Sequence, residues 1–107
     1  MFIHDDARRR LIEFGSGTFK VCKALVAKEG CVVGDHHHRL KDESFLLLSG
    51  KAVYVVIGGE TWCNVEAPYE WHVPRGTYHR FEFTPGSVLI GIGTERFDPA
   101  DEIKGKP

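Results

Sequence analysis

The chain has 107 residues, which is enough for one domain and no more. It carries 14 basic and 15 acidic residues, and a formal net charge of -1 gives no electrostatic reason to expect a nucleic acid or an anionic membrane as partner. No apolar run approaches the roughly 20 residues that a membrane-spanning helix needs. We therefore expect a single domain over residues 1–107, with neither nucleic acid nor membrane among its partners.

The cysteines and the first residues bear on localisation. Cys22, Cys31 and Cys63 are odd in number and lie far apart, which differs from the disulfide framework of a small secreted protein. Residues 1–6 lack the basic start and the apolar core of a signal peptide. We expect a soluble cytoplasmic protein with reduced thiols.

Short runs rich in Val, Ile, Phe and Tyr alternate with glycine-containing turns, as is typical of an all-β sandwich or barrel. In chain order, the expected strands cover residues 19–27, 44–48, 52–57, 60–65, 79–83 and 88–92. Gly58-Gly59 predicts a two-residue hairpin between two of them. After the last strand, Asp98 as cap and Pro99 at the first position predict a helical turn that extends to Ile103.

Two of these runs, residues 45–48 and 54–57, are apolar without alternation. A strand of this kind is covered on both faces. In a protein of one domain, the barrel interior covers one face, and a second sheet or a second subunit covers the other. We therefore expect a homodimer.

One group of polar residues suggests a metal-binding site. His36 and His38 are two residues apart and face the same way on a strand, whereas His37 faces the other way. A short turn then leads to Glu43. Two imidazoles and a carboxylate are common ligands of Fe(II), Mn(II), Ni(II) and Zn(II). His79 begins a strand just after the turn at residues 74–76 and is the best candidate for a fourth ligand.

A shared cation would satisfy all four ionisable groups at once inside a small barrel. We therefore expect one divalent metal ion, Fe, Mn, Ni or Zn, bound by His36, His38, Glu43 and His79. Phe45, Phe81 and Phe83 share the strand parity of these ligands and are expected to face the barrel interior.

Two segments carry a family resemblance. Residues 30–50 resemble the first cupin motif and match it at every specified position. The matching residues are Gly30, His36, His38, Glu43 and Gly50. Residues 68–83 resemble the second cupin motif at Pro74, Gly76 and His79, but Pro68 stands where that motif has glycine and Phe83 where it has asparagine. The resemblance implies a cupin, which is an all-β jelly-roll barrel (double-stranded β-helix) of six to eight antiparallel strands with a metal near its centre.

The resemblance leaves three functions open. In the family, this ligand set supports dioxygenase, isomerase and lyase chemistry, which implies a metal-dependent enzyme acting on a small polar molecule such as a sugar or a carboxylate. Residues 88–103 also resemble the end of the sugar-nucleotide ketoisomerase branch of cupins, which implies that His36 and His38 act as acid and base on a keto-sugar without a metal. The third is a non-catalytic barrel that binds a small molecule.

Overall fold

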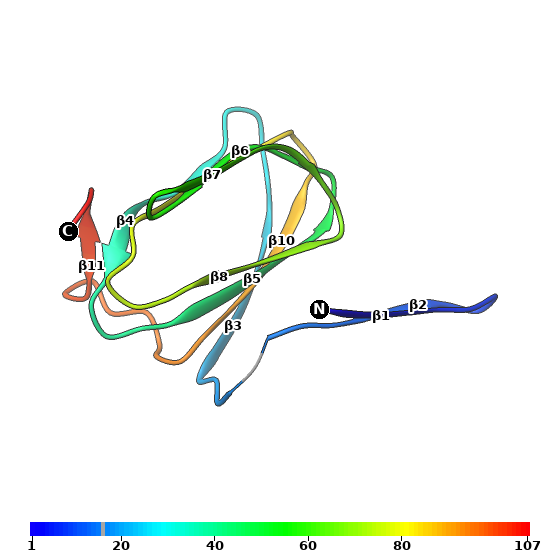
Figure 1. Ribbon diagram of the computed structural model, residues 1–107, viewed down its shortest axis with the longest axis horizontal. Coiled ribbons are helices and arrows are strands. Elements are labelled where there is room, and N and C mark those ends of the chain that lie inside the picture. Colours follow the sequence, from blue (N-terminus) through cyan, green and yellow to red (C-terminus); the bar gives the residue numbers. More distant parts are fainter. Residues whose placement is uncertain (16) are drawn as a thin grey trace.

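The computed structural model describes residues 1–15 and 17–107, and this part of the chain consists of strands, turns and loops (Figure 1). Its strands are β1 (Phe2–Asp5), β2 (Arg10–Glu13), β3 (Val21–Val26), β4 (Val32–His38), β5 (Glu43–Ser49), β6 (Lys51–Ile57), β7 (Glu60–Glu66), β8 (Tyr69–Val73), β9 (His79–Phe83), β10 (Val88–Gly93) and β11 (Glu102–Lys104). Their pairings are antiparallel. The described ranges hold no helix that could cross a membrane.

Two sheets enclose the core. One has the order β3-β10-β5-β8 and the other the order β11-β4-β9-β6-β7. The described residues thus place nine strands in the two sheets, more than the six to eight expected. The hydrophobic effect holds the sheets together through a continuous cluster of buried apolar side chains. Its members are Ala27, Phe45, Leu47, Ala52, Val55, Ile57, Trp71, Val73, Phe81, Phe83 and Leu89.

The strands expected from the sequence agree with β3, β5, β6, β7, β9 and β10 to within two residues at each end. The turn at Gly58-Gly59 joins β6 to β7 as predicted. Phe45, Phe81 and Phe83 face the interior, with exposed fractions of 2%, 0% and 5%. Strand parity therefore assigned these three side chains to the correct face of the barrel.

The predicted helical turn near the C-terminus is wrong beyond its first residues. Asp98 does cap a turn, because its Oδ1 accepts the amide of Ala100 at 2.9 Å and its carbonyl accepts the amide of Asp101 at 3.0 Å. The next three residues form β11, which pairs with β4. The backbone of these residues finds its hydrogen-bond partners on the open edge of β4, so the chain leaves the helical conformation.

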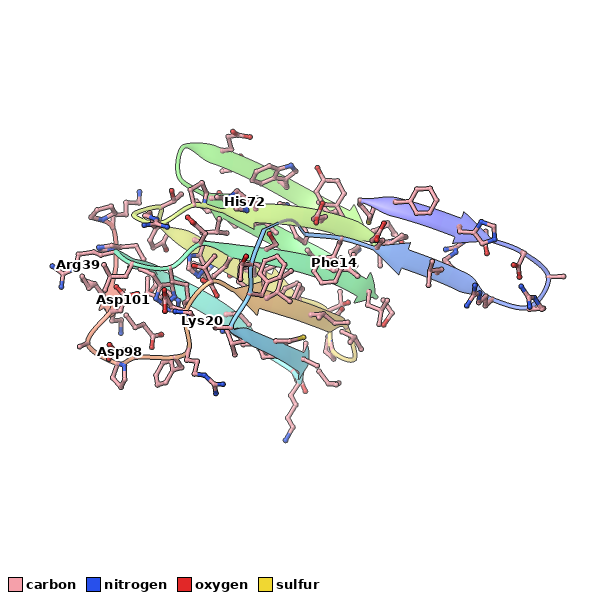
Figure 2. The ribbon with its side chains drawn as sticks, turned by 90° about the horizontal axis from the view of Figure 1, so that it is seen from below. Phe14, Lys20, Arg39, His72, Asp98 and Asp101 are labelled. Carbon is pink, nitrogen blue, oxygen red and sulfur yellow. The ribbon has the colours of Figure 1, made fainter. Side chains whose placement is uncertain are left out.

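Strands β1 and β2 form a separate two-stranded ribbon, the arm, which extends away from the barrel (Figure 1). Glu70 of β8 holds its base at two points. Its Oε1 lies 3.2 Å from the N-terminal ammonium of Met1, and its Oε2 accepts the amide of Gly15 at 2.6 Å. Just after the arm, Phe14 lies over the outer face of the four-stranded sheet (Figure 2).

One of the two strands that are apolar on both faces, β5, has part of its outer face covered within the chain. Leu46 of β5 points outward by alternation, yet it is only 2% exposed. Its burial in the single chain means that the same chain covers it, whereas the sequence analysis had assigned this cover to a second sheet or subunit. On β6, by contrast, Tyr54 is 37% exposed in the single chain, so the expected cover of its second face by another subunit stays a prediction.

The core predicts the effect of truncating Phe81. Its ring is fully buried and lies 5.1 Å from the ring of Phe45 and 5.4 Å from that of Trp71, measured between centroids. Phe81→Ala should lower the free energy of unfolding by about 3–5 kcal/mol, because it removes buried surface and leaves a cavity. Phe97→Ala, at a side chain that is 63% exposed, should change it by less than about 0.5 kcal/mol. Urea denaturation measures both, and equal losses would contradict this account of the core.

Candidate active site

A bulge in β4 sets the position of the first two histidines. The register between β4 and β9 shifts between Gly34 and His36, and after the shift His36 pairs with His79. Gly34 has φ +89°, and a Cβ there would lie 2.5 Å from the carbonyl oxygen of His79, so only glycine fits. Asp35 also has a positive φ of 62°, and its Oδ1 accepts a hydrogen bond from Tyr78 Oη at 2.6 Å. The bulge is thereby tied to the residue that precedes His79.

The bulge brings three histidines together inside the barrel. The metal-binding atoms of His36, His38 and His79 lie within 4.8 Å of one another. Their ring centroids are 4.7 Å apart for His36 and His38, 4.6 Å for His36 and His79, and 5.7 Å for His38 and His79. The side chains of His38 and His79 are almost fully buried, whereas that of His36 is 16% exposed. His36 is therefore the member of the cluster that solvent reaches most easily.

Glu43 lies at one side of this cluster with a side chain that is 3% exposed. Its Oε1 is 3.3 Å from His38 Nε2 and 3.7 Å from His79 Nε2, and this oxygen accepts no hydrogen bond from the described residues. The four residues singled out in the sequence therefore do meet, with Glu43 beside two of the three imidazoles.

Two lysines that the sequence analysis did not single out lie close to the other oxygen of Glu43. Lys41 is 3% exposed and places Nζ 3.9 Å from Glu43 Oε2. Lys23 reaches in from a half-exposed position on β3 and places Nζ 3.6 Å from the same oxygen. Lys41 lies between β4 and β5, outside any strand, so strand parity gave no signal for it.

The C-terminal segment adds two carboxylates behind the histidines. Glu102 Oε1 lies 2.8 Å from His36 Nδ1, and Asp101 Oδ2 lies 3.9 Å from His38 Nδ1. Asp101 also accepts the amides of Arg39 and Leu40 at 3.0 Å each. Figure 2 shows Arg39 and Asp101 at the end of the barrel opposite the arm. The site therefore lies far from the arm.

His36 is reached through a hollow of about 290 Å³ on the surface. Gly34, Asp35, His36, Glu102 and Lys104 line it. The remaining histidines of the barrel stay outside the cluster, as expected for His37. His37 is turned away and contacts the carbonyl of Gly105 through Nδ1 at 2.8 Å, and His72 is exposed and contacts Ser44 Oγ at 3.3 Å.

Burial controls the charge of the three imidazoles. It lowers the pKa of His36 and of His38 below the ordinary 6.5, and nearby carboxylates, Glu102 and Glu43 for His36 and Glu43 for His38, offset part of this effect. Burial lowers the pKa of His79 to about 3, and the neighbouring His36 acts in the same direction. At neutral pH each ring is therefore neutral, with one N–H donor and one free lone pair.

These residues fit a divalent metal ion. Three neutral imidazoles offer lone pairs within a few ångströms of each other, and Glu43 Oε1 is a buried acceptor without a partner among the described residues. Nitrogen and oxygen donors of this kind accept several divalent ions. His36, His38, His79 and Glu43 would hold such an ion.

The lowered pKa of His79 predicts a loss of stability in acid. Below pH 6.5 the unfolded chain binds a proton at His79 that the folded protein does not bind until about pH 3, so falling pH favours unfolding. Between pH 7.5 and pH 5 this difference should remove about 2 kcal/mol from the free energy of unfolding. His79→Gln should abolish this part of the loss, measured by urea denaturation at the two pH values. A loss as large in His79→Gln as in the wild type, with His72→Gln as control, would contradict the assignment.

The sequence matches no protein-family model and no curated protein. Solved structures do match, over almost the whole chain. WlaRB, a TDP-quinovose 3,4-ketoisomerase from Campylobacter jejuni, has a TM-score of 0.83 at 16% identity, covering 96% of this chain and 87% of that one. QdtA, a sugar 3,4-ketoisomerase from Thermoanaerobacterium thermosaccharolyticum solved in complex with TDP, has a TM-score of 0.80 at 17% identity, covering 97% and 83%.

The capsular polysaccharide assembling protein CapF from Staphylococcus aureus is 24% identical, with a TM-score of 0.69. The match covers 99% of this chain but only 34% of CapF. Likeness at these identities establishes the fold. The chain has the all-β, antiparallel jelly-roll fold of the cupins, as the two sequence motifs implied.

Proposed function

We propose that this protein is a sugar-nucleotide 3,4-ketoisomerase that works without a metal, with His36 and His38 as acid and base. Its substrate would be a hexose that carries a ketone and is linked to a nucleoside diphosphate. The observation that carries the proposal is the likeness of the whole barrel to solved 3,4-ketoisomerases, with a pair of neutral imidazoles at its centre. It was the second of the three functions that the sequence left open.

The chemistry of such an isomerisation suits two imidazoles. The ketone and the hydroxyl on the adjacent carbon exchange places through an enediol. A base removes the proton from the carbon that bears the hydroxyl, and an acid protonates the carbonyl oxygen. A proton then returns to the neighbouring carbon, so no oxidant or reductant is needed. Groups whose pKa lies near or below neutrality can both accept and return these protons, and His36 and His38 lie close enough together to serve adjacent carbons.

The charges around Glu43 favour this function over a metal-dependent one. A buried carboxylate needs a compensating positive charge, which a divalent ion could provide. Here the ammonium groups of Lys41 and Lys23 already lie within 4 Å of Glu43. They neutralise the carboxylate and would repel a dication bound beside it.

The expected metal-dependent enzyme, of dioxygenase, isomerase or lyase type, is the second candidate. The observation that favours it is Glu43 Oε1, a buried oxygen beside His38 and His79 without a hydrogen-bond donor among the described residues. A bound divalent ion would act as a Lewis acid that polarises a carbonyl or hydroxyl of the substrate.

The proposed function predicts exchange of solvent hydrogen into a keto-sugar. With a TDP-linked 4-keto-6-deoxyhexose in D2O, the wild-type protein should form the 3-keto isomer and incorporate deuterium at the carbon that the ketone leaves. His36→Asn and His38→Asn should each lower the rate by about 100-fold or more, because each removes an acid–base group. His72→Asn, at an exposed histidine outside the cluster, should keep the wild-type rate. NMR spectroscopy follows both the product and the deuterium.

Treatment with a chelator separates the candidates. The proposed enzyme keeps its rate after chelation and contains no stoichiometric metal. Activity that disappears on chelation and returns with one divalent ion would instead establish the second candidate. Binding of the sugar nucleotide without any exchange would leave the third function, a non-catalytic barrel.

We also propose that the protein is a homodimer in solution, with the arm as the contact. Phe2 and Leu11 lie on one face of the arm by strand alternation, and they are 56% and 43% exposed. Ile3, on the other face, is 40% exposed. A ribbon that extends from the barrel with exposed apolar side chains on both faces can bury them against a second copy.

The dimer predicts a measurable mass. One chain has a mass of 12.0 kDa, so light scattering after size-exclusion chromatography should give twice that value. The double variant Phe2→Asp with Leu11→Asp should elute as a monomer, because it places charges in the contact. Phe97→Asp, at an exposed apolar residue outside the arm, should remain dimeric. A wild-type protein of 12.0 kDa would refute the proposal.

A further inference from the structure

The bulge of β4 places a strained backbone directly before His36. Asp35 has φ +62°, in the left-handed region that residues other than glycine, asparagine and aspartate rarely adopt. Gly34, just before it, lies so close to the carbonyl oxygen of His79 that an added Cβ would be 2.5 Å from that atom. The direction in which the chain leaves Asp35 sets where His36 and His38 lie. A conformation of this kind persists only where neighbouring groups hold it.

Two hydrogen bonds hold Asp35. Its Oδ1 accepts a hydrogen bond from Tyr78 Oη at 2.6 Å, and its carbonyl oxygen accepts the amide of Gly105 at 2.9 Å. Gly105 in turn accepts a hydrogen bond from His37 Nδ1 at 2.8 Å. The residue that follows β11 is therefore bound to both chain neighbours of His36, while Tyr78 alone holds the side chain at the bulge.

Tyr78 joins the bulge to the third histidine of the cluster. It immediately precedes His79, and its carbonyl oxygen accepts the amide of Gly58 at 2.8 Å, which fixes its backbone to the turn between β6 and β7. From this fixed backbone the hydroxyl reaches Asp35. The contact therefore links the position of His36 to that of His79. Among the described residues, Asp35 lines the hollow at His36 but Tyr78 does not, so Tyr78 acts from behind the site.

We propose that Tyr78 is a positioning residue, whose hydrogen bond to Asp35 holds the bulge of β4 and thereby keeps His36 at its working distance from His38 and His79. The consequence for catalysis rests on the proposed function. Without the hydroxyl, the side chain of Asp35 loses its partner while its backbone stays strained. The bulge then relaxes and shifts the imidazole of His36. A displacement of about 1 Å at a reacting group can lower a rate by about 100-fold.

Kinetics test this role in the full chain. With the TDP-linked 4-keto-6-deoxyhexose, Tyr78→Phe should lower kcat and the rate of deuterium incorporation by about 10- to 100-fold. KM should change less than about twofold, because Tyr78 does not line the hollow in the described part of the chain. Tyr54→Phe, at the exposed tyrosine of β6, should leave both constants unchanged. An unchanged kcat in Tyr78→Phe, or an effect on KM alone, overturns the proposal.

Substitutions at Asp35 separate its conformation from its charge. Asp35→Asn keeps an acceptor for Tyr78 and tolerates a positive φ, and Asp35→Gly removes the strain. Each should keep kcat within about threefold of the wild-type value. Asp35→Ala has neither property and should lower kcat as far as Tyr78→Phe does. Equal losses in all three variants would show that the carboxylate itself takes part in the reaction, and would overturn the positioning role.

Hydrogen exchange tests the same contact without substrate. The amide of Gly105 donates to the carbonyl oxygen of Asp35, so its exchange rate in NMR reports the state of the bulge. The rate should rise at least about fivefold in Tyr78→Phe, while the amide of Ala27, which donates to the carbonyl of Ser87, should keep its rate. An unchanged rate at Gly105 overturns the proposal. A wild-type protein that exchanges no hydrogen into the keto-sugar overturns the proposed function, whereas the rate at Gly105 still decides whether Tyr78 holds the bulge.

Discussion

The carboxylate of Glu43 is the charge on which the rest of the site depends. It lies inside a barrel whose walls are largely apolar, and its side chain is 3% exposed. An isolated carboxylate in such a place would be strongly unfavourable, so the surrounding residues must supply positive charge or hydrogen-bond donors. Lys41, Lys23 and two imidazoles converge on it for this reason. The arrangement joins β3, β4, β5 and β9, so a single buried charge ties both sheets together at this end of the barrel.

Much of this end could be predicted from the sequence because its geometry is local. The spacing of His36 and His38 follows from the period of a strand, and the bulge at Gly34 and Asp35 precedes both residues, so it moves them together. The turn before His79 lies against β4, since the amide of Gly76 donates to the carbonyl of His38. The second cupin motif therefore acts on the first through the backbone, which explains why the four residues that the resemblance singled out lie together.

The parts that the sequence did not predict depend on contacts between distant residues. Strand β11 has three residues, too few for a period, and its pairing with β4 joins positions about 65 residues apart. Its carboxylates therefore gave no signal beside His36. The arm was also missed, because its two strands have four residues each and show no alternation of apolar and polar residues. Its base is held by the distant carboxylate of Glu70.

The histidine cluster alone does not decide between acid–base and metal chemistry, because both need neutral imidazoles whose far nitrogen is held. The contact between Glu102 and His36 serves either purpose, since ligating histidines commonly donate their second N–H to a carboxylate. The distinction lies in what balances Glu43. A carboxylate left with only imidazoles around it would attract a dication, whereas a carboxylate already paired with a buried ammonium gains much less from one. The position of Lys41, which is buried with its ammonium 3.9 Å from Glu43, is therefore stronger evidence for choosing between acid–base and metal chemistry than the position of any of the three histidines.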